Sequence, residues 1–307
     1  MRNTGFLGAC AQFVASGARN QVANDRWQIT NCGASPITAF SIKKGGRFGN
    51  AVIQLVNAVH IAKRCGIKRI HVGNLDMPPD LVLKDGTFDG IELIASRSAS
   101  RETTLSGTFF HLAGFEDFAP TAAERITLTK SLGSNYVLKD IGREGPRPRK
   151  MVIHIKAGDI FTDAVPHPGY TQPPLSYYQV AIRDAVQRYG VNAVHVVFED
   201  RSNPCVSALE EWLATTKLNW KCTSLGFVSD ARTIISASIV CIGAGSFAPA
   251  LLLMSNRVKA VYRFRASQRP LPLDADLHQI VERPGTYIKD WHGTPEQRQL
   301  MVQLPTF

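Results

Sequence analysis

The segment His154-Ile155-Lys156-Ala157-Gly158-Asp159 gathers four residue types that can do chemistry. It follows an apolar run, so we expect it at the end of a β-strand. Lys156 can neutralise phosphate oxygens, Gly158 lets the backbone approach a ligand, and Asp159 can accept a proton or hold Lys156. His154 lies between two isoleucines, which also fits a histidine packed in a core. The combination favours a site for a phosphorylated ligand.

Three further segments place polar residues after an expected strand or at an expected helix start. Glu199 and Asp200 suit recognition of ribose or sugar hydroxyls, and are equally understandable as solvated surface charge. Ser229 and Asp230 are expected to open a helix, with Ser229 as a cap and Asp230 facing the helix dipole or a ligand hydroxyl. The turn Gly243-Ala244-Gly245-Ser246-Phe247 offers backbone amides to a phosphate, or is simply a tight turn.

An alternating series of strands and helices is expected to position these segments. The predicted strands are 151–155, 193–198, 239–242 and 258–262. The predicted helices are 177–189, 207–215, 231–238 and 247–254. A further helix is expected to start at Thr294-Pro295-Glu296-Gln297, with Thr294 as N-cap. In an open parallel sheet, ligands bind beyond the carboxyl ends of the strands, where these segments fall.

The first half of the chain contains a β-α-β pattern. The run 37–42 predicts a strand, Val52 to Ala62 has helical spacing, and 68–72 predicts a second strand. Between them lies the loop Lys43-Lys44-Gly45-Gly46-Arg47-Phe48-Gly49-Asn50. Such units build parallel sheets covered by helices, so an α/β fold of two doubly wound, Rossmann-like domains is expected.

The domain boundary is expected near residue 146. Residues 73–140 carry a weaker pattern, which predicts loops and short elements. The stretch 142–149 is punctuated by Gly and Pro and rich in Arg, so we interpret it as a linker. The predicted domains are residues 1–146 and residues 147–307.

The hexapeptide 154–159 resembles the His-x-Arg-x-Gly-Asp donor motif of the fucosyltransferase superfamily, which includes α-1,2-, α-1,6- and protein O-fucosyltransferases. Gly45-Gly46-Arg47-Phe48-Gly49-Asn50 is similar to the Gly-Gly-x-Gly-Asn motif of the α-1,2 members. Weaker similarities follow at Glu199-Asp200 with Asn203-Pro204, at Ser229-Asp230 and at Gly245-Ser246-Phe247. The matching segments are spread between residue 45 and about residue 255.

Two positions depart from the family pattern. Lys156 replaces the arginine, which keeps the charge but loses the planar bidentate fork that suits a diphosphate. The segment 246–249 reads Ser-Phe-Ala-Pro, whereas Ser-Phe-x-Trp is common in the α-1,2 group. The identity of the sugar, fucose or another, is therefore left open.

The resemblance implies a GT-B architecture of two domains facing across a cleft, with the acceptor on residues 1–146, including the loops of 73–140, and the nucleotide-sugar donor on residues 147–307. It also implies a glycosyltransferase that inverts the sugar carbon, with a GDP-linked sugar as the expected donor. It implies donor binding by His154, Lys156, Gly158, Glu199, Asp200, Ser229, Asp230, Gly245, Ser246 and Phe247. Arg47, Gly49 and Asn50 would form an acceptor or phosphate loop. No Asp-x-Asp triplet is present, so no metal is expected, and Lys156 with nearby amides would stabilise the leaving diphosphate.

The general base is not fixed by the sequence. Candidates are Asp159, Glu116, Asp117, His111 and His154. Asp159 and Lys156 are taken as the catalytic pair, and Asp159 could instead be structural. The segment 167–178, rich in proline and aromatic residues, could cover the donor or stack on a sugar, or it could be a rigid packed loop.

The composition favours a globular protein with packed cores and argues against a membrane-spanning one. The chain has 307 residues, 44% hydrophobic and 20% charged, which is enough apolar material for packed cores. No apolar run approaches a transmembrane span and no secretory leader is evident, so a cytoplasmic location is expected. Six cysteines lie far apart without metal-ligand spacing and are expected to be reduced.

The formal charge of +10 implies attraction to polyanions. No basic-aromatic module accompanies it, so no specific nucleic-acid partner is expected. Nucleotide diphosphates or peripheral association with an anionic membrane explain the charge equally well. A noncatalytic nucleotide- or glycan-binding protein on the same scaffold is the main alternative. A nicotinamide dehydrogenase is disfavoured because neither first strand is followed by G-x-G-x-x-G.

Overall fold

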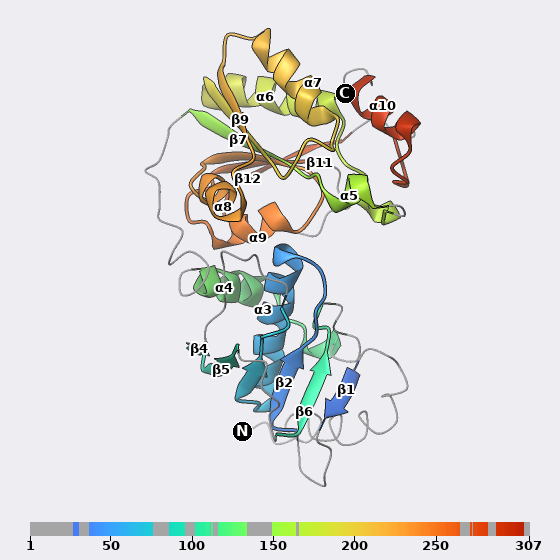
Figure 1. Ribbon diagram of the computed structural model, residues 1–307. Coiled ribbons are helices and arrows are strands. Elements are labelled where there is room, and N and C mark those ends of the chain that lie inside the picture. The colour runs from blue at the N-terminus through green and yellow to red at the C-terminus, as the bar shows by residue number, and fades with distance from the viewer. Residues whose placement is uncertain are drawn as a thin grey trace. The chain divides into compact units, whose positions relative to one another are not determined.

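The computed structural model describes residues 27–30, 37–75, 86–95, 102–110, 112, 116–133, 149–163, 166–264, 271, 273–281 and 287–303. The chain divides into two compact units, residues 1–140 and 141–307, each built around its own six-stranded sheet (Figure 1). The linker predicted at 142–149 lies outside the described residues except for Arg149. The domain boundary at 146 therefore stays a prediction.

Unit 1 is a mixed sheet with a parallel centre. Its strand order is β1-β6-β2-β3-β5-β4, in which β6, β2, β3 and β5 pair in parallel and the edge strands β1 and β4 pair antiparallel. The strands are β1 (Trp27–Thr30), β2 (Ala39–Ile42), β3 (Arg69–His71), β4 (Gly86–Phe88), β5 (Ile91–Ile94) and β6 (Thr104–Gly107). The helical segments are α3 (Phe48–Cys65), η2 (Glu116–Phe118) and α4 (Ala122–Leu132).

Helix α3 packs its apolar side against the sheet of unit 1. Apolar residues at helical spacing, from Val52 to Ala62, are buried against β2, β3 and β5, and the helix ends at Gly66 with a left-handed φ of 73°. Helix α4 packs on α3 and begins with a capping box between Thr121 and Glu124. Within the region 73–140, expected to hold loops and short elements, the described residues form three short strands, the short helix η2 and the eleven-residue helix α4.

Unit 2 is a fully parallel sheet with strand order β12-β11-β10-β7-β8-β9. The strands are β7 (Lys150–Ile155), β8 (Ala193–Phe198), β9 (Asn219–Thr223), β10 (Ile239–Ile242), β11 (Ala260–Phe264) and β12 (Asp276–Ile280). The helical segments are α5 (Asp159–Thr162), η4 (Pro168–Tyr170), α6 (Leu175–Tyr189), α7 (Cys205–Ala214), α8 (Phe227–Ile235), α9 (Phe247–Met254) and α10 (Pro295–Gln303).

Helices cover both faces of this sheet. Helices α6, α7 and α10 pack together on one face, and α8 and α9 pack together on the other (Figure 1). The core on the first face is built from alternate residues of the central strands, among them Ile153, Ile155 and Val196, against Tyr177 and Leu209. This confirms the predicted α/β class with two parallel-rich sheets.

The cysteines of the described residues are free thiols, at positions 65, 205, 222 and 241. Burial raises the pKa of Cys222 and of Cys241 to about 12, so both stay protonated at neutral pH. None of the helices in the described part of the chain combines the length and apolar character needed to span a bilayer.

Candidate functional site

The strand order of unit 2 places two of the predicted loops at one point. From β7 the chain adds β8 and then β9 on one side of the sheet, and it then returns to add β10, β11 and β12 on the other side of β7. The order in which strands are added therefore reverses between β7 and β10, which is the switch point of the sheet. Ligands of open α/β sheets bind beyond the carboxyl ends of the strands at this switch point. The loop Lys156 to Gly158 follows β7, and the loop Gly243 to Ser246 follows β10. The fold therefore brings these two predicted segments together.

The two loops lie close together. A Cβ atom added to Gly245 would lie 3.9 Å from Lys156 Cγ. Gly245 has a φ of 131°, which residues with a side chain rarely adopt, and Ser246 follows as the N-cap residue of α9 without a side-chain cap bond. Backbone amides at this helix start and the Lys156 side chain thus border the same region.

Gly158 makes the turn after β7 possible. Its φ of 71° and ψ of −131° lie in a region that essentially only glycine occupies, and a Cβ there would stand 2.6 Å from Glu199 Oε2. Its amide donates to Ser202 Oγ at 3.1 Å. Fully buried Asn203 donates to the carbonyl of Lys156 at 2.9 Å and accepts from the amide of Cys205. The loop after β8 therefore braces the loop after β7.

Lys156 is paired with two carboxylates. Its Nζ lies 2.8 Å from Asp159 Oδ1 and 3.5 Å from Glu199 Oε2, and its side chain is 16% exposed. Asp159 Oδ1 also accepts from the amide of Ile160 at 3.0 Å. The structure thus joins the catalytic pair proposed from the sequence, Lys156 and Asp159, and adds Glu199 to it.

His154 lies on the same sheet face as Lys156, because the two residues are two positions apart. It is 8% exposed, and its ring centroid is 5.2 Å from that of Phe247 in α9, whose ring contacts Phe227 in α8. Burial, with the positive charge of Lys156, lowers the pKa of His154 to about 3. The imidazole is neutral at physiological pH, which makes it a poor general base and a good neutral hydrogen-bonding group.

Glu199 and Asp200 have different surroundings. Glu199 faces the loop after β7, whereas Asp200 Oδ1 accepts from the amide of Ser202 within its own turn at 2.8 Å. Burial of Asp200 opposes ionisation, but hydrogen bonds from Ser202 and Gly158 outweigh it, so its pKa is lowered. Glu199 pairs with Lys156 and Asp200 bonds within its own turn, so each carboxylate has a partner in the structure. Their role toward a ligand stays a prediction.

The prediction that Ser229 caps a helix is wrong. Helix α8 begins at Phe227, two residues earlier, and Gly226 with a φ of 85° is its N-cap. Asp230 is buried and accepts from the amide of Leu225 at 3.3 Å, and burial raises its pKa to about 6. Helix α8 packs on α9 and β7, so both residues belong to the helix layer on the face of His154. Their role toward a ligand stays a prediction.

The loop of unit 1 lies at an equivalent position in its own sheet. It follows β2, and the chain direction reverses between β2 and β6 in the order β5-β3-β2-β6. Arg47 is the N-cap of α3, and Gly49 and Asn50 lie in its first turn. Gly46 has a φ of 71°, and a Cβ on it would collide with the side chain of Asn50. Asn50 thus packs against the glycine turn.

Gln54 in α3 ties this loop to the one after β6. It donates to the carbonyl of Gly45 at 2.8 Å and accepts from the amide of Phe109 at 3.2 Å, while Asn57 donates to the carbonyl of Phe109. Both amide side chains are almost fully buried. Sequence reasoning missed them, although two polar residues on the apolar face of a predicted helix were a visible signal.

The remaining predicted bases lie in unit 1 or outside the described residues. His111 is not described, nor is the side chain of Glu116, and Asp117 is exposed in η2. The aromatic segment 167–178 is divided, because residues 167–170 are exposed whereas Tyr177 and Tyr178 are fully buried. Tyr177 donates to the carbonyl of Ile242 at the end of β10. Only Tyr170 of that segment is among the exposed large hydrophobic residues described.

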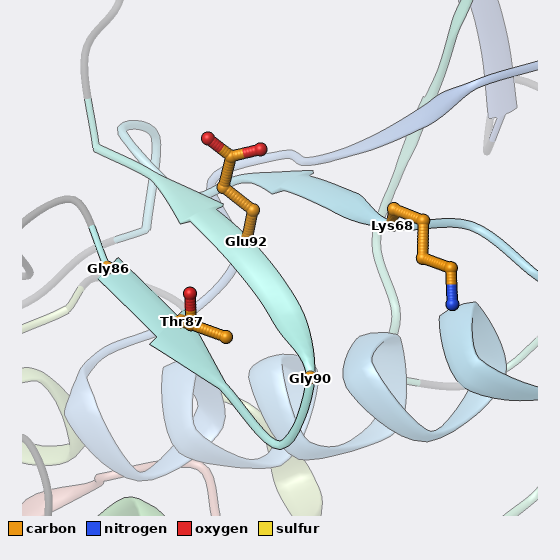
Figure 2. A pocket seen from close by; sticks show the side chains of 5 residues that line it. All are labelled: Lys68, Gly86, Thr87, Gly90 and Glu92. Atoms are coloured by element: carbon orange, nitrogen blue, oxygen red, sulfur yellow. The ribbon is translucent and has the colours of Figure 1, made fainter.

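A surface pocket of about 340 Å³ lies in unit 1 (Figure 2). Its lining residues are Lys68, Gly86, Thr87, Gly90 and Glu92. Lys68 and Gly90 directly precede β3 and β5, at the edge opposite to the one where α/β sheets bind ligands, whereas Gly86 and Thr87 lie in the antiparallel edge strand β4. Nor do the described residues contain a group of three or more His, Cys, Asp or Glu placed to hold a metal ion.

Comparison with known proteins yields similarity of fold alone. No family model matches the sequence, and no curated protein does. Among solved structures, POFUT1 in complex with GDP is 10% identical with a TM-score of 0.39, and the match covers 74% of this chain and 99% of the POFUT1 chain.

Two further similar structures come from E. coli. The iron-containing dodecameric glycosyltransferase TibC from enterotoxigenic E. coli H10407 is 11% identical with a TM-score of 0.43, covering 83% of this chain and 64% of its own. The heptosyltransferase WaaC with ADP is 9% identical with a TM-score of 0.39, and the match covers 80% of this chain and 93% of the WaaC chain. At these values no site residue can be transferred, and the chain is similar to glycosyltransferase structures only in its α/β organisation.

Proposed function

We propose that this chain is an inverting, metal-independent glycosyltransferase that moves a sugar from a nucleoside diphosphate to a glycan hydroxyl. The observation that carries the proposal is the junction of the loops after β7 and β10. There Lys156, the glycine turns at 158 and 245 and the start of α9 meet at the switch point of a parallel sheet. A cation beside the backbone amides of a helix start suits a diphosphate.

The chemical step needs a counter-charge and a base. As the bond between the sugar carbon and the β-phosphate oxygen breaks, negative charge grows on the diphosphate, and Lys156 with the amides near Gly245 and Ser246 would stabilise it. The acceptor hydroxyl would attack from the opposite side and lose its proton to a carboxylate. Asp159 is our candidate for that carboxylate.

The Lys156–Asp159 ion pair suggests how these roles are linked. Asp159 Oδ1 lies 2.8 Å from the Lys156 ammonium. A diphosphate arriving at Lys156 would compete for that ammonium and release Asp159 from the ion pair. Donor binding would thus make the carboxylate of Asp159 available to accept the proton of the acceptor hydroxyl.

The finer assignments rest on the resemblance of two motifs. The hexapeptide 154–159 and the glycine loop 45–50 favour a GDP-linked sugar, with fucose as the first candidate. Glu199 and Asp200 would bind hydroxyls, and Ser229, Asp230 and Phe247 would border the nucleoside. We assign donor binding to residues 147–307 and the acceptor, through Arg47, Gly49 and Asn50, to residues 1–146.

Donor turnover tests the proposal. The protein is incubated with GDP-fucose, other GDP-sugars, UDP-sugars and an ADP-sugar, with and without a glycan mixture, and release of nucleoside diphosphate is measured. We expect release from one donor class, unchanged by a metal chelator and at least about tenfold slower in Asp159→Asn. Turnover that requires added metal would refute the metal-independent part, and no release from any donor would refute the transferase.

A noncatalytic nucleotide- or glycan-binding protein is the second candidate. It is favoured by one observation: Lys156 stands where the family has arginine, and two carboxylates already share its single charge. Such a protein would bind a nucleotide without releasing product from any donor. Binding and turnover measured on the same sample therefore separate the two candidates.

A further inference from the structure

The segment 287–303 reaches back to the candidate site through α5. The indole Nε1 of Trp291 donates to the carbonyl of Ile160 at 2.9 Å, and Arg298 donates to the carbonyl of Phe161 at 2.5 Å. The ring of Trp291 packs on that of Phe161 at a centroid distance of 5.2 Å, and the Arg298 guanidinium lies over the same ring. Trp291 itself is fully buried.

Helix α5 needs such support. It has four residues, Asp159–Thr162, so it is too short to be stable by its own hydrogen bonds. The last carbonyls of a helix have no partner within it. In α5, Trp291 and Arg298 supply donors for two of them. Because Asp159 is the first residue of α5, the same contacts fix the carboxylate that holds Lys156.

The segment also supports the other loop of the site. Tyr287 donates to the carbonyl of Gln172 at 2.8 Å, and Thr171 donates to the carbonyl of Lys289 at 3.1 Å. The side chain of Gln172 is fully buried, and its Oε1 would lie 3.2 Å from a Cβ on Gly243, the first residue after β10. The segment 287–303 therefore braces the surroundings of both loops.

We infer that Trp291 and Arg298 are positioning residues of the candidate site, which hold the Lys156–Asp159 pair in place through α5. This inference deepens the proposed function and depends on it for its effect on ligand affinity. Neither residue touches Lys156 in the contacts described. Their effect on a ligand must therefore pass through the backbone of α5.

The test uses Arg298→Ala, the conservative Arg298→Lys and Trp291→Phe. Arg188→Ala is the matched control, because Arg188 also holds an acceptor by guanidinium hydrogen bonds, to Asp184 on α6. Hydrogen exchange reports α5 directly through the amides of Phe161, Thr162 and Asp163, which bond to Gly158 and Asp159. We expect these amides to exchange roughly tenfold faster in Arg298→Ala and Trp291→Phe, with the amides of α8 unchanged.

Ligand affinity separates positioning from a purely structural role. The dissociation constant of the best nucleotide is measured for each variant in the wild-type background and with Lys156→Ala. We expect Arg298→Ala to weaken binding about fivefold to tenfold in the wild-type background, Arg298→Lys to restore part of it, and neither to change binding once Lys156 is gone. Arg188→Ala should leave affinity unchanged.

Two outcomes overturn the inference. One is unaltered exchange of the α5 amides in both variants, and the other is faster exchange with unchanged nucleotide affinity. If the wild type binds none of the nucleotides, the proposed function fails, while the exchange rates still decide whether this segment holds α5.

Discussion

Gly158 and Glu199 are so close that a Cβ atom at position 158 would stand 2.6 Å from Glu199 Oε2. The first residue belongs to the turn after β7 and the second follows the neighbouring strand β8. Their approach lets Glu199 reach Lys156, at 3.5 Å. A larger residue at position 158 must therefore push Glu199 away from the lysine.

Gly158→Ala should disturb the candidate site more than the fold. The backbone at 158, with φ 71° and ψ −131°, is unfavourable for alanine, and we expect a loss of about 2 to 3 kcal/mol in the free energy of unfolding. Gly190→Ala is the matched control, since Gly190 has a φ of 63° in the left-handed region and no atom near its Cβ position. The control should cost about 1 kcal/mol.

Nucleotide affinity distinguishes these two glycine variants. Only Gly158→Ala should weaken binding, because only there does the methyl group displace Glu199. Equal affinity of both variants, measured by calorimetry at a temperature where both are folded, would contradict the arrangement of Gly158, Glu199 and Lys156.

The buried His154 should make the protein sensitive to mild acid. Its folded pKa of about 3 lies below the unfolded value of 6.5, so the unfolded state binds more protons between these values and stability falls as the pH falls. From pH 7 to pH 5 the wild type should lose about 2 kcal/mol more than His154→Gln. Urea unfolding at the two pH values measures this. An equal loss in both proteins would mean that His154 is not buried in its neutral form.

Asp230 should make the stability of the folded state depend on pH in the opposite direction. Its folded pKa of about 6 lies above the ordinary value of 3.8, so the folded state binds more protons in that window and stability falls as the pH rises. Asp230→Asn should abolish this dependence and stabilise the protein at pH 7 by on the order of 1 kcal/mol, allowing for partial solvation. If Asp230→Asn is instead less stable at pH 7, the carboxylate has a compensating partner.

Gln54 should be essential to the loop of unit 1. Gln54→Ala removes a donor to Gly45 and an acceptor for the buried amide of Phe109, which should cost about 2 to 4 kcal/mol. Lys63→Ala, on the exposed end of the same helix, removes only a surface ion pair with Asp89 and should cost less than about 1 kcal/mol. Thermal unfolding of both variants, followed by circular dichroism, compares them, and equal costs would contradict the role of Gln54.

Elements that bury apolar side chains could be predicted accurately from the sequence. The strands 193–198 and 239–242 and the helix 247–254 were predicted with the bounds that β8, β10 and α9 have. The cap of α10 is also confirmed, since the amide of Gln297 donates to Thr294 Oγ1. These segments are clear because their apolar periodicity coincides with their burial.

Edge strands and tertiary contacts were not predictable in the same way. Strands β9 and β12 are largely exposed and carry mixed polar residues, so only pairing with β8 and β11 shows them to be strands. The bracing of Lys156 by Asn203, and of α5 by Trp291, joins residues 47 and 131 positions apart. Local pattern carries no information about such pairs. The positions of His154, Lys156, Gly158 and Gly245 were predictable because His154 lies near the end of a well-marked strand and the other three follow such strands.

The central claim, that a nucleoside diphosphate binds at Lys156, is tested most directly by a thermal-shift panel of GDP, UDP, ADP, CMP and their sugars. A ligand at about 100 times its dissociation constant adds about 2.7 kcal/mol to the stability of the folded state. Lys156→Ala is compared with Lys63→Ala, which also loses a lysine–aspartate ion pair, at 2.7 Å. We predict that a nucleoside diphosphate raises the unfolding midpoint of the wild type and of Lys63→Ala but not of Lys156→Ala. A shift that survives Lys156→Ala, or no shift with any nucleotide, would contradict the claim.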